Sequence, residues 1–134
     1  MKDEKIILKC NNIPQFYIYE MTNLEFEYNN NGDKIWKDIV IELSNSMSEN
    51  VESNVVKVID EQNGRKGALK VKILILNVKN EKFIHGYELI GSYIKGAKFV
   101  NYTYYECEPI QKARTVIITL QIEDIKIIES KEGK

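Results

Sequence analysis

The chain has 134 residues, a net charge of −1 and 43% hydrophobic residues. These values suit one soluble domain and argue against a disordered chain or a strongly basic nucleic-acid binder. Twenty residues are isoleucine and three are alanine, which disfavours a helical bundle because β-branched side chains prefer a sheet. We therefore predict a single, mostly β domain over residues 1–134, with an N-terminal arm over 1–15 and a polar tail over 129–134.

The sequence contains no pattern that directs the chain to a membrane. The charged start is followed by an apolar stretch, Ile6–Leu8, that is far too short for a signal-peptide core. No apolar run approaches the roughly 20 residues that span a bilayer. Cys10 and Cys107 cannot make a disulfide framework, so we expect a reducing cytoplasm and no membrane partner.

Charge is divided unevenly along the chain. Residues 1–64 carry 6 basic and 12 acidic side chains, whereas residues 65–98 carry 8 basic and 2 acidic ones. Acidic and basic strands could pair within one sheet. Alternatively, one acidic and one basic surface could associate head to tail, as in rings and open stacks.

The first elements are predicted to form a long β-hairpin. Residues 17–28 alternate apolar and polar side chains with a period of two, and residues 35–43 do so again. Between them, Asn29–Gly32 tolerates positive φ and supplies a turn.

The period then changes to that of a helix. Val51, Val55, Val58 and Ile59 form one apolar stripe, so we predict one α-helix over about residues 51–62. Ser48 or Asn50 can cap its start and Gly64 can end it. Valines are poor helix formers, so the helix must be held by packing against a sheet.

Strands are predicted again after the helix. Ala68–Leu76 should be covered on both faces at its end, because Leu74 and Leu76 are apolar on the second face. Further strands are expected over residues 82–89, 99–105 and 113–128, for a total of six or seven. Gly91 and Gly96 mark a bend or a bulge.

Catalytic and metal-binding patterns are weak, so we do not expect an enzyme, a metal site or a cofactor. His85 is the only histidine, and no zinc spacing includes it. Gly91–Lys98 begins like a phosphate loop but has Ala97 where the lysine belongs. Cys107 lies between two glutamates, which disfavour a thiolate.

Aromatic residues near lysines leave a binding module as one alternative. Tyr93, Tyr102, Tyr104 and Tyr105 lie near lysines 95 and 98, a composition that could stack the bases of a single strand. The mixed charge around them argues against it.

The order of the segments resembles a known family, the tail tube proteins of contractile-tailed phages, which share a fold with type VI secretion tube proteins. The resemblance covers residues 16–128. It rests on an aromatic-then-alternating strand (Trp36–Asn45), the helix that follows it (Val51–Gln62) and the central strand (Leu69–Asn77). An aromatic–x–Leu–x–Gly–x–aromatic segment (Tyr87–Ile94) and two closing strands (Phe99–Tyr102 and Val116–Leu120) complete it.

This resemblance implies a β-sandwich or barrel-like subunit of a virion structural protein. Such subunits close into hexameric rings that stack head to tail into a hollow tube, with sheath and baseplate proteins as partners and DNA passing non-specifically through the lumen. The implied location is the virion tail, assembled in the host cytoplasm. Alternatives are a tube initiator, terminator or baseplate component of the same fold, or a small β-barrel binding module.

The resemblance also implies a site. The loop that reaches the neighbouring ring corresponds to Asn29, Asn30, Asn31, Gly32, Asp33 and Lys34. We interpret Trp36 and Tyr87 as anchors of the core or of a subunit interface.

Overall fold

The structure is a computed structural model of the whole chain, and it describes residues 4–10, 15–43, 51–62, 65, 69–77, 79–80, 82–104 and 111–129. Its elements in chain order are β1 (Glu4–Cys10), β2 (Phe16–Met21), β3 (Phe26–Tyr28), β4 (Lys34–Trp36), β5 (Ile39–Leu43), α1 (Val51–Gln62), β6 (Val71–Asn77), β7 (Phe83–Ile90), β8 (Tyr93–Tyr104), β9 (Gln111–Gln121) and β10 (Asp124–Glu129).

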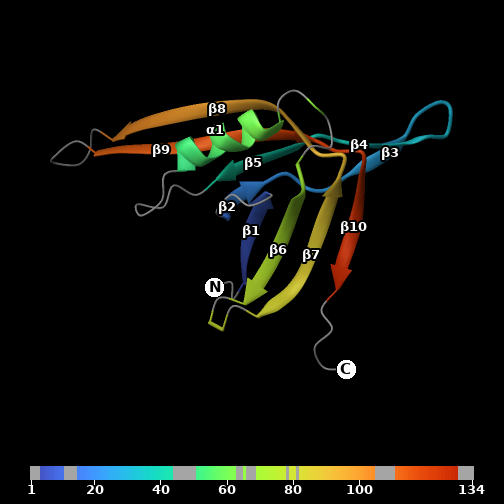
Figure 1. Cartoon of the computed structure of the whole chain (residues 1–134), viewed down its shortest axis with the longest axis horizontal. Helices are drawn as coiled ribbons and strands as arrows, with labels where there is room; N and C mark the ends of the chain where they lie inside the picture. Colours follow the sequence, from blue (N-terminus) through green and yellow to red (C-terminus); the bar gives the residue numbers. More distant parts are fainter. Residues whose placement is uncertain are drawn as a thin grey trace.

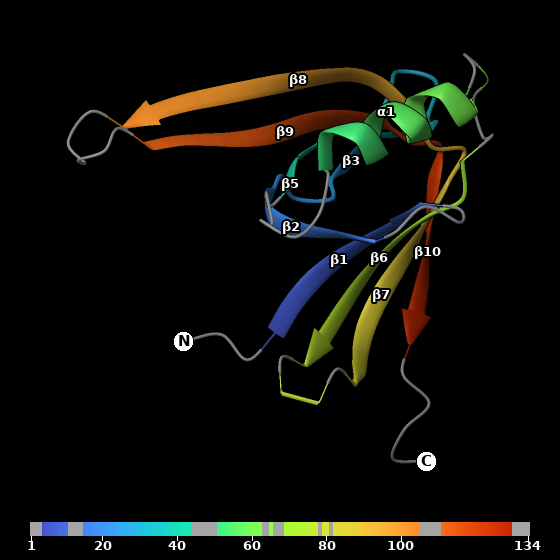
Figure 2. The same cartoon turned by 60° about the vertical axis from the view of Figure 1, so that its left-hand side comes forward.

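Within the described residues, eight strands form one antiparallel sheet in the order β10-β7-β6-β1-β2-β5-β9-β8. The sheet changes direction at β2: Phe16 and Tyr17 pair with β1, whereas Ile18, Glu20 and Met21 pair with β5. Strands that bend from one layer into another make the corners of such folds. Figure 2 shows the result, with β1, β6, β7 and β10 on one side of β2 and β5, β8 and β9 on the other.

The core lies between these two halves of the sheet and α1. In β5, Ile39, Ile41 and Leu43 are fully buried, and Ile41 lies opposite Ile118 of β9. Alternate residues of a strand share a face, so the period-two pattern of the sequence becomes one apolar surface.

Helix α1 covers part of that surface, next to β8 and β9 (Figure 1). It spans the predicted residues, and Val51, Val55 and Val58 are buried in the core. The mostly β fold with one helix is thus confirmed. The capping residues expected at 48, 50 and 64 lie outside the described residues.

The predicted hairpin is present but interrupted. Residues 22–25 separate β2 from β3, and residues 37–38 separate β4 from β5. At the break, the Thr22 backbone N–H donates to the Val40 carbonyl (3.0 Å), and the Val40 N–H donates to Thr22 Oγ1 (3.0 Å). The predicted strand over 113–128 is divided in the same way into β9 and β10. These interruptions raise the strand count above the predicted six or seven.

The first described segment of the chain is a strand. Within the expected arm (1–15), residues 4–10 form β1, which pairs with β6 on one side and β2 on the other. Leu8 is fully buried and belongs to the core. Charged residues stand on both sides of the short apolar run Ile6–Leu8, so this strand has no period-two pattern long enough to predict it. Of the polar tail (129–134), Glu129 ends β10 and the other residues lie outside the described part.

The second face of β6 is partly covered, as predicted: Leu74 and Leu76 are half-buried. Gly86 of β7 lies opposite Leu74. A Cβ added at Gly86 would lie 2.9 Å from the Ile73 carbonyl oxygen and 3.1 Å from Cε1 of Phe83.

We expect Gly86→Ala to destabilise the fold by about 1–3 kcal/mol, because the backbone oxygen of Ile73 cannot move aside. Gly96→Ala is the matched control, since nothing lies within 4 Å of a Cβ at Gly96. Urea unfolding of both variants measures the difference. Equal stabilities would contradict the close packing around β7.

Candidate assembly interface

The loop predicted to reach a neighbouring ring is the tip of the β3–β4 hairpin, which projects from the rest of the molecule (Figure 1). Asn29 organises the tip: its Oδ1 accepts from the backbone N–H groups of Asn31 and Asp33, both at 2.9 Å. Gly32 has φ 83°, a conformation that favours glycine. The Asn-rich sequence therefore builds a defined turn.

One face of this hairpin is aromatic, and we call Phe26, Tyr28, Lys34 and Trp36 the hairpin aromatic face. The rings of Phe26 and Tyr28 are 5.6 Å apart, and those of Phe26 and Trp36 are 5.1 Å apart. Lys34 Nζ lies 4.8 Å from the centroid of Phe26, within cation–π range. Tyr28 is 64% exposed and Phe26 43% exposed. Exposed aromatic rings on a projecting element suit a protein–protein contact.

The base of the hairpin is fixed to the body. Trp36 packs against the core, and its Nε1–H donates to Asp124 Oδ1 at the start of β10 (3.3 Å). Lys37 and Glu25 form an exposed ion pair at 3.7 Å. Trp36 thus joins the hairpin to the core.

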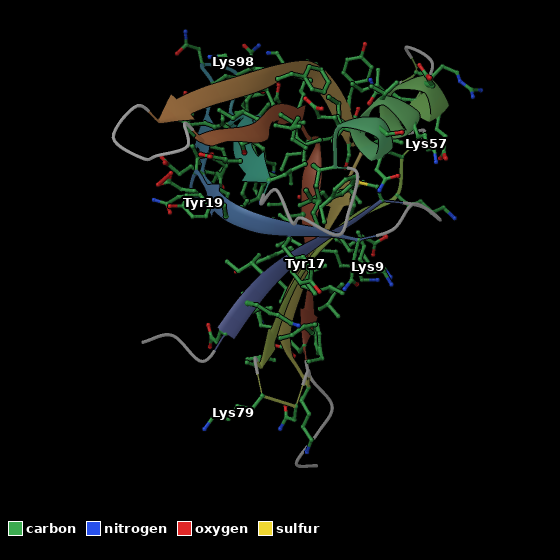
Figure 3. All side chains as sticks on the ribbon, turned by 90° about the vertical axis from the view of Figure 1, so that its left-hand side faces the viewer. Lys9, Tyr17, Tyr19, Lys57, Lys79 and Lys98 are labelled. Atoms are coloured by element: carbon green, nitrogen blue, oxygen red, sulfur yellow. The ribbon has the colours of Figure 1, made fainter. Side chains whose placement is uncertain are left out.

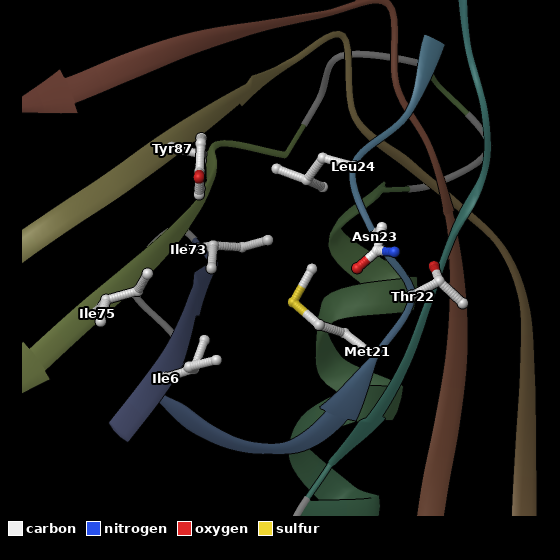
Figure 4. A pocket seen from close by; sticks show the side chains of 8 residues that line it. All are labelled: Ile6, Met21, Thr22, Asn23, Leu24, Ile73, Ile75 and Tyr87. Carbon is white, nitrogen blue, oxygen red and sulfur yellow. The ribbon is translucent and has the colours of Figure 1, made fainter. Parts of the chain in front are cut away.

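Tyr87 lies away from the hairpin tip, in an apolar groove of about 450 Å³ (Figure 4). The ring of His85 contacts it edge-on at 4.9 Å. The described lining is mostly aliphatic, from β1, β6, the end of β2 and the segment that follows it: Ile6, Met21, Thr22, Asn23, Leu24, Ile73 and Ile75. Such a lining offers packing surface rather than acid–base chemistry.

The last strand of the sheet, β8, presents an edge. Its one strand neighbour among the described residues is β9, and Lys95, Gly96, Ala97, Lys98 and Phe99 are exposed. The ladder shifts register between residues 94 and 96, which confirms the predicted bulge. Unpaired edges of this kind invite another strand.

A second unpaired edge lies on β2. The half of β2 over Ile18–Met21 pairs with β5 alone within the described residues. Tyr19 and Glu20 are exposed there, and Figure 3 shows Tyr19 on β2 and Lys98 on β8 pointing outward. The charged side chain on the β2 edge is Glu20, whereas the β8 edge carries Lys98 and Lys95, the latter paired with Asp38.

The structure contains examples of both interpretations of the uneven charge distribution, the pairing of acidic with basic strands and the separation of charge onto different surfaces. Lys95 Nζ binds Asp38 Oδ2 at 2.7 Å, joining a basic strand to the acidic first half. Glu88 of β7 lies between Lys72 of β6 and Lys126 of β10 in the sheet. Lys9 and Lys72, however, are like-charged neighbours, and Lys98 is exposed.

The segment that begins like a phosphate loop starts with a turn between two strands. Gly91 (φ 67°) turns the chain between β7 and β8, where Ser92 Oγ donates to the Leu89 carbonyl at 2.6 Å. Among the described residues, no three His, Cys, Asp or Glu side chains are placed to hold a metal ion. No described helix is long and apolar enough to cross a membrane. Cys107, Tyr102, Tyr104 and Tyr105 have no described side chains.

Cys10 is a buried free thiol. Desolvation by burial, with a smaller contribution from the charge of Glu61, raises the pKa of the Cys10 thiol from 9.0 to about 12.

We expect this shift to make stability depend on alkaline pH. Above about pH 9 the unfolded chain releases the thiol proton while the native chain keeps it, so the free energy of unfolding falls. The loss amounts to about 2 kcal/mol between about pH 8 and pH 10.5. Urea unfolding of the wild type and of Cys10→Ala measures it, because other titrations are common to both. A difference between the two proteins that stays constant with pH would contradict the prediction.

Comparison with known proteins gives matches among solved structures. No protein-family model matches the sequence, and no curated protein does. Hcp1 from Flavobacterium johnsoniae matches with a TM-score of 0.61 and 9% identity, over 94% of this chain and 96% of that chain. A chain of the PVC sheath–tube complex, an extracellular contractile injection system, matches with a TM-score of 0.61 and 9% identity, over 94% and 89% of the two chains. The tube-terminating cap of the anti-feeding prophage gives 0.56 and 11% identity over 93% and 88%.

The chain has the tail-tube fold. At these identities the likeness is one of fold, and it extends over nearly the whole of each protein compared. The tail-tube fold predicted from the order of segments is therefore confirmed. Two of the three structures compared belong to a sheath–tube complex and a tube-terminating cap.

Two contacts of this tail-tube fold were not predicted from the sequence. Asp124 binds Trp36 across the molecule, and no local pattern indicates that pair. Gln62 is buried at the end of α1 and binds β8. Its signal is present in the sequence, because Gln62 continues the stripe of Val55 and Val58 with a polar residue.

Proposed function

We propose that this chain is the structural subunit of a contractile-tail tube. It forms hexameric rings that stack head to tail, and DNA passes through the lumen of the tube. The observation that carries the proposal is the likeness to injection-system components over nearly the whole chain. The unpaired edges of β2 and β8 and the projecting hairpin supply contacts of the two kinds that a stacked ring needs.

Contacts within a ring would use the sheet edges. The β8 edge of one copy would accept the Ile18–Met21 edge of the next, so that the sheets of neighbouring subunits continue one another. Such a contact joins two different surfaces and closes when the rotation per subunit fits. Backbone hydrogen bonds supply the affinity in strand addition, and the opposite charges near Glu20 and Lys98 favour this orientation.

Contacts between rings would use Asn29–Lys34 and the hairpin aromatic face. Burial of one exposed aromatic side chain stabilises a contact by about 1.5–3 kcal/mol. Sheath and baseplate proteins are the further partners, and the tail of a virion, assembled in the host cytoplasm, is the proposed location. Trp36 and Tyr87 are proposed as anchors that hold these surfaces to the core.

The likeness to the anti-feeding prophage cap favours a second candidate, a protein that ends the tube. The two functions predict different assemblies as the protein concentration rises. A tube subunit elongates with concentration, whereas a terminator forms single rings or binds the ends of existing tubes.

Negative-stain electron microscopy across a concentration series, with sedimentation velocity, tests the proposal on the full chain. Hollow tubes support the tube subunit, and isolated rings that do not elongate support the terminator. A protein that remains monomeric at every concentration would contradict intrinsic assembly and would favour the β-barrel binding module.

A further inference from the structure

One buried polar side chain joins the helix to the edge of the sheet. Gln62, the last residue of α1, is 3% exposed. Its Oε1 accepts from the Ile94 backbone N–H at 2.6 Å, and its Nε2 donates to the Ile94 carbonyl at 2.8 Å. Both backbone groups of Ile94 are therefore occupied by a side chain that imitates a neighbouring strand.

The position of this contact relative to the edge is informative. Ile94 immediately precedes the bulge at Lys95, and the exposed edge of β8 begins after it, over Lys95–Phe99. A strand that adds to β8 can use the exposed residues but cannot extend to Ile94 without displacing Gln62. Since Gln62 is a buried residue at the end of α1, displacing its side chain would leave buried polar groups unpaired, which is costly.

We propose that Gln62 is the end-stop for strand addition at β8, and that it fixes the register in which the β2 edge of a second copy pairs there. The proposal rests on the ring contact proposed above and adds a positioning residue to it. Backbone N–H and C=O groups repeat every two residues along the edge of a strand. Two paired edges can therefore shift by two residues while each side chain stays on the same face of the sheet. A stop at Ile94 removes slippage in that direction and so sets the limit to which the added strand can pair, and ring closure needs one register at every contact.

The experiment compares the wild type with Gln62→Met, which has similar length and no hydrogen-bonding amide. Val56→Met is the matched control, because Val56 is exposed on the same helix. Hydrogen exchange on each purified protein first reports whether the Ile94 amide is protected in the wild type and released in Gln62→Met. We expect the Ile94 amide to exchange at least tenfold faster in Gln62→Met and unchanged in Val56→Met.

Register is then read by cross-linking. Tyr19→Cys is combined in turn with a cysteine at Lys95, Ala97 or Phe99, in a Cys107→Ser background, and inter-subunit disulfides are counted. In the wild-type context we expect one of the three positions to dominate. In Gln62→Met we expect products at two or more positions, together with rings of mixed diameter by electron microscopy.

The outcomes separate the two proposals. Wild-type protein that forms neither rings nor cross-links overturns the proposed function and, with it, this inference. Wild-type rings whose single register and diameter are unchanged in folded Gln62→Met overturn the end-stop alone. If Gln62→Met does not fold, Gln62→Glu is the second variant: it keeps the acceptor for the Ile94 N–H and loses the donor, and an unchanged register in it likewise overturns the end-stop.

Discussion

Replacing Asn29–Asp33 by a two-residue Asn-Gly turn is expected to leave the subunit folded and to weaken tube growth. The change shortens the Asn29–Lys34 loop and keeps the pairing of Tyr28 with Lys34, because Asn-Gly supports a tight hairpin turn. The removed tip is exposed and makes no contact with the core, so the midpoint of urea unfolding should be unchanged. Loss of about 1.4 kcal/mol of hydrogen bonding per inter-ring contact raises the concentration needed for growth roughly tenfold.

Two further variants test whether the hairpin acts through its aromatic face. Tyr28→Ser removes the most exposed ring of that face and should reduce growth in the same direction. Val56→Ser is the control, because it removes an exposed apolar side chain from α1. Sedimentation and electron microscopy measure tube mass and length. Normal tubes from the shortened hairpin would contradict a stacking role for this loop.

Leu8→Asp is expected to abolish folding. Leu8 is fully buried in β1 between β2 and β6, and an unpaired buried carboxylate costs several kcal/mol, which approaches the whole stability of an ordinary domain. Circular dichroism and solubility report the loss.

Lys9→Asp, at the adjacent exposed residue, should fold normally, because it places an acidic side chain opposite Lys72. A free N-terminal arm would instead tolerate both changes, so a folded Leu8→Asp protein would contradict the central position of β1.

Periodicity was sufficient to predict much of the fold. The stripe of Val51, Val55 and Val58 places α1, and the alternation around Ile41 and Ile118 places β5 and the part of β9 over residues 115–121, because one face of each of these segments is buried. Where burial changes within an element, the same patterns are misleading. The break at residues 22–25 is set by hydrogen bonds between Thr22 and Val40, which are far apart in sequence.

The position of the candidate assembly interface could be predicted from the sequence, but the contacts between its side chains could not. Asn29–Gly32 has strong local turn chemistry, so the tip of the hairpin follows from four residues. The stacking of Lys34 on Phe26 follows only from the register of β3 with β4. The contact of Trp36 with Asp124 and the binding of Gln62 to Ile94 join segments that meet through the whole topology. The sequence indicates that Gln62 lies on the buried stripe of α1, but it does not indicate the partner in either pair.

The pairing of strands that are distant in sequence also sets the order in which parts of the subunit can form during synthesis. β5 needs β9, and β1 needs β6, so the hairpins β6–β7 and β8–β9 can form locally, but the sheet closes late. Long-range pairing of this kind slows folding. On the ribosome, the edge of β5 stays open until β9 has emerged, and the outer edge of β8 is built by the same event. A nascent chain therefore completes the β8 edge, which is proposed above for contacts between subunits, at the moment its core is completed.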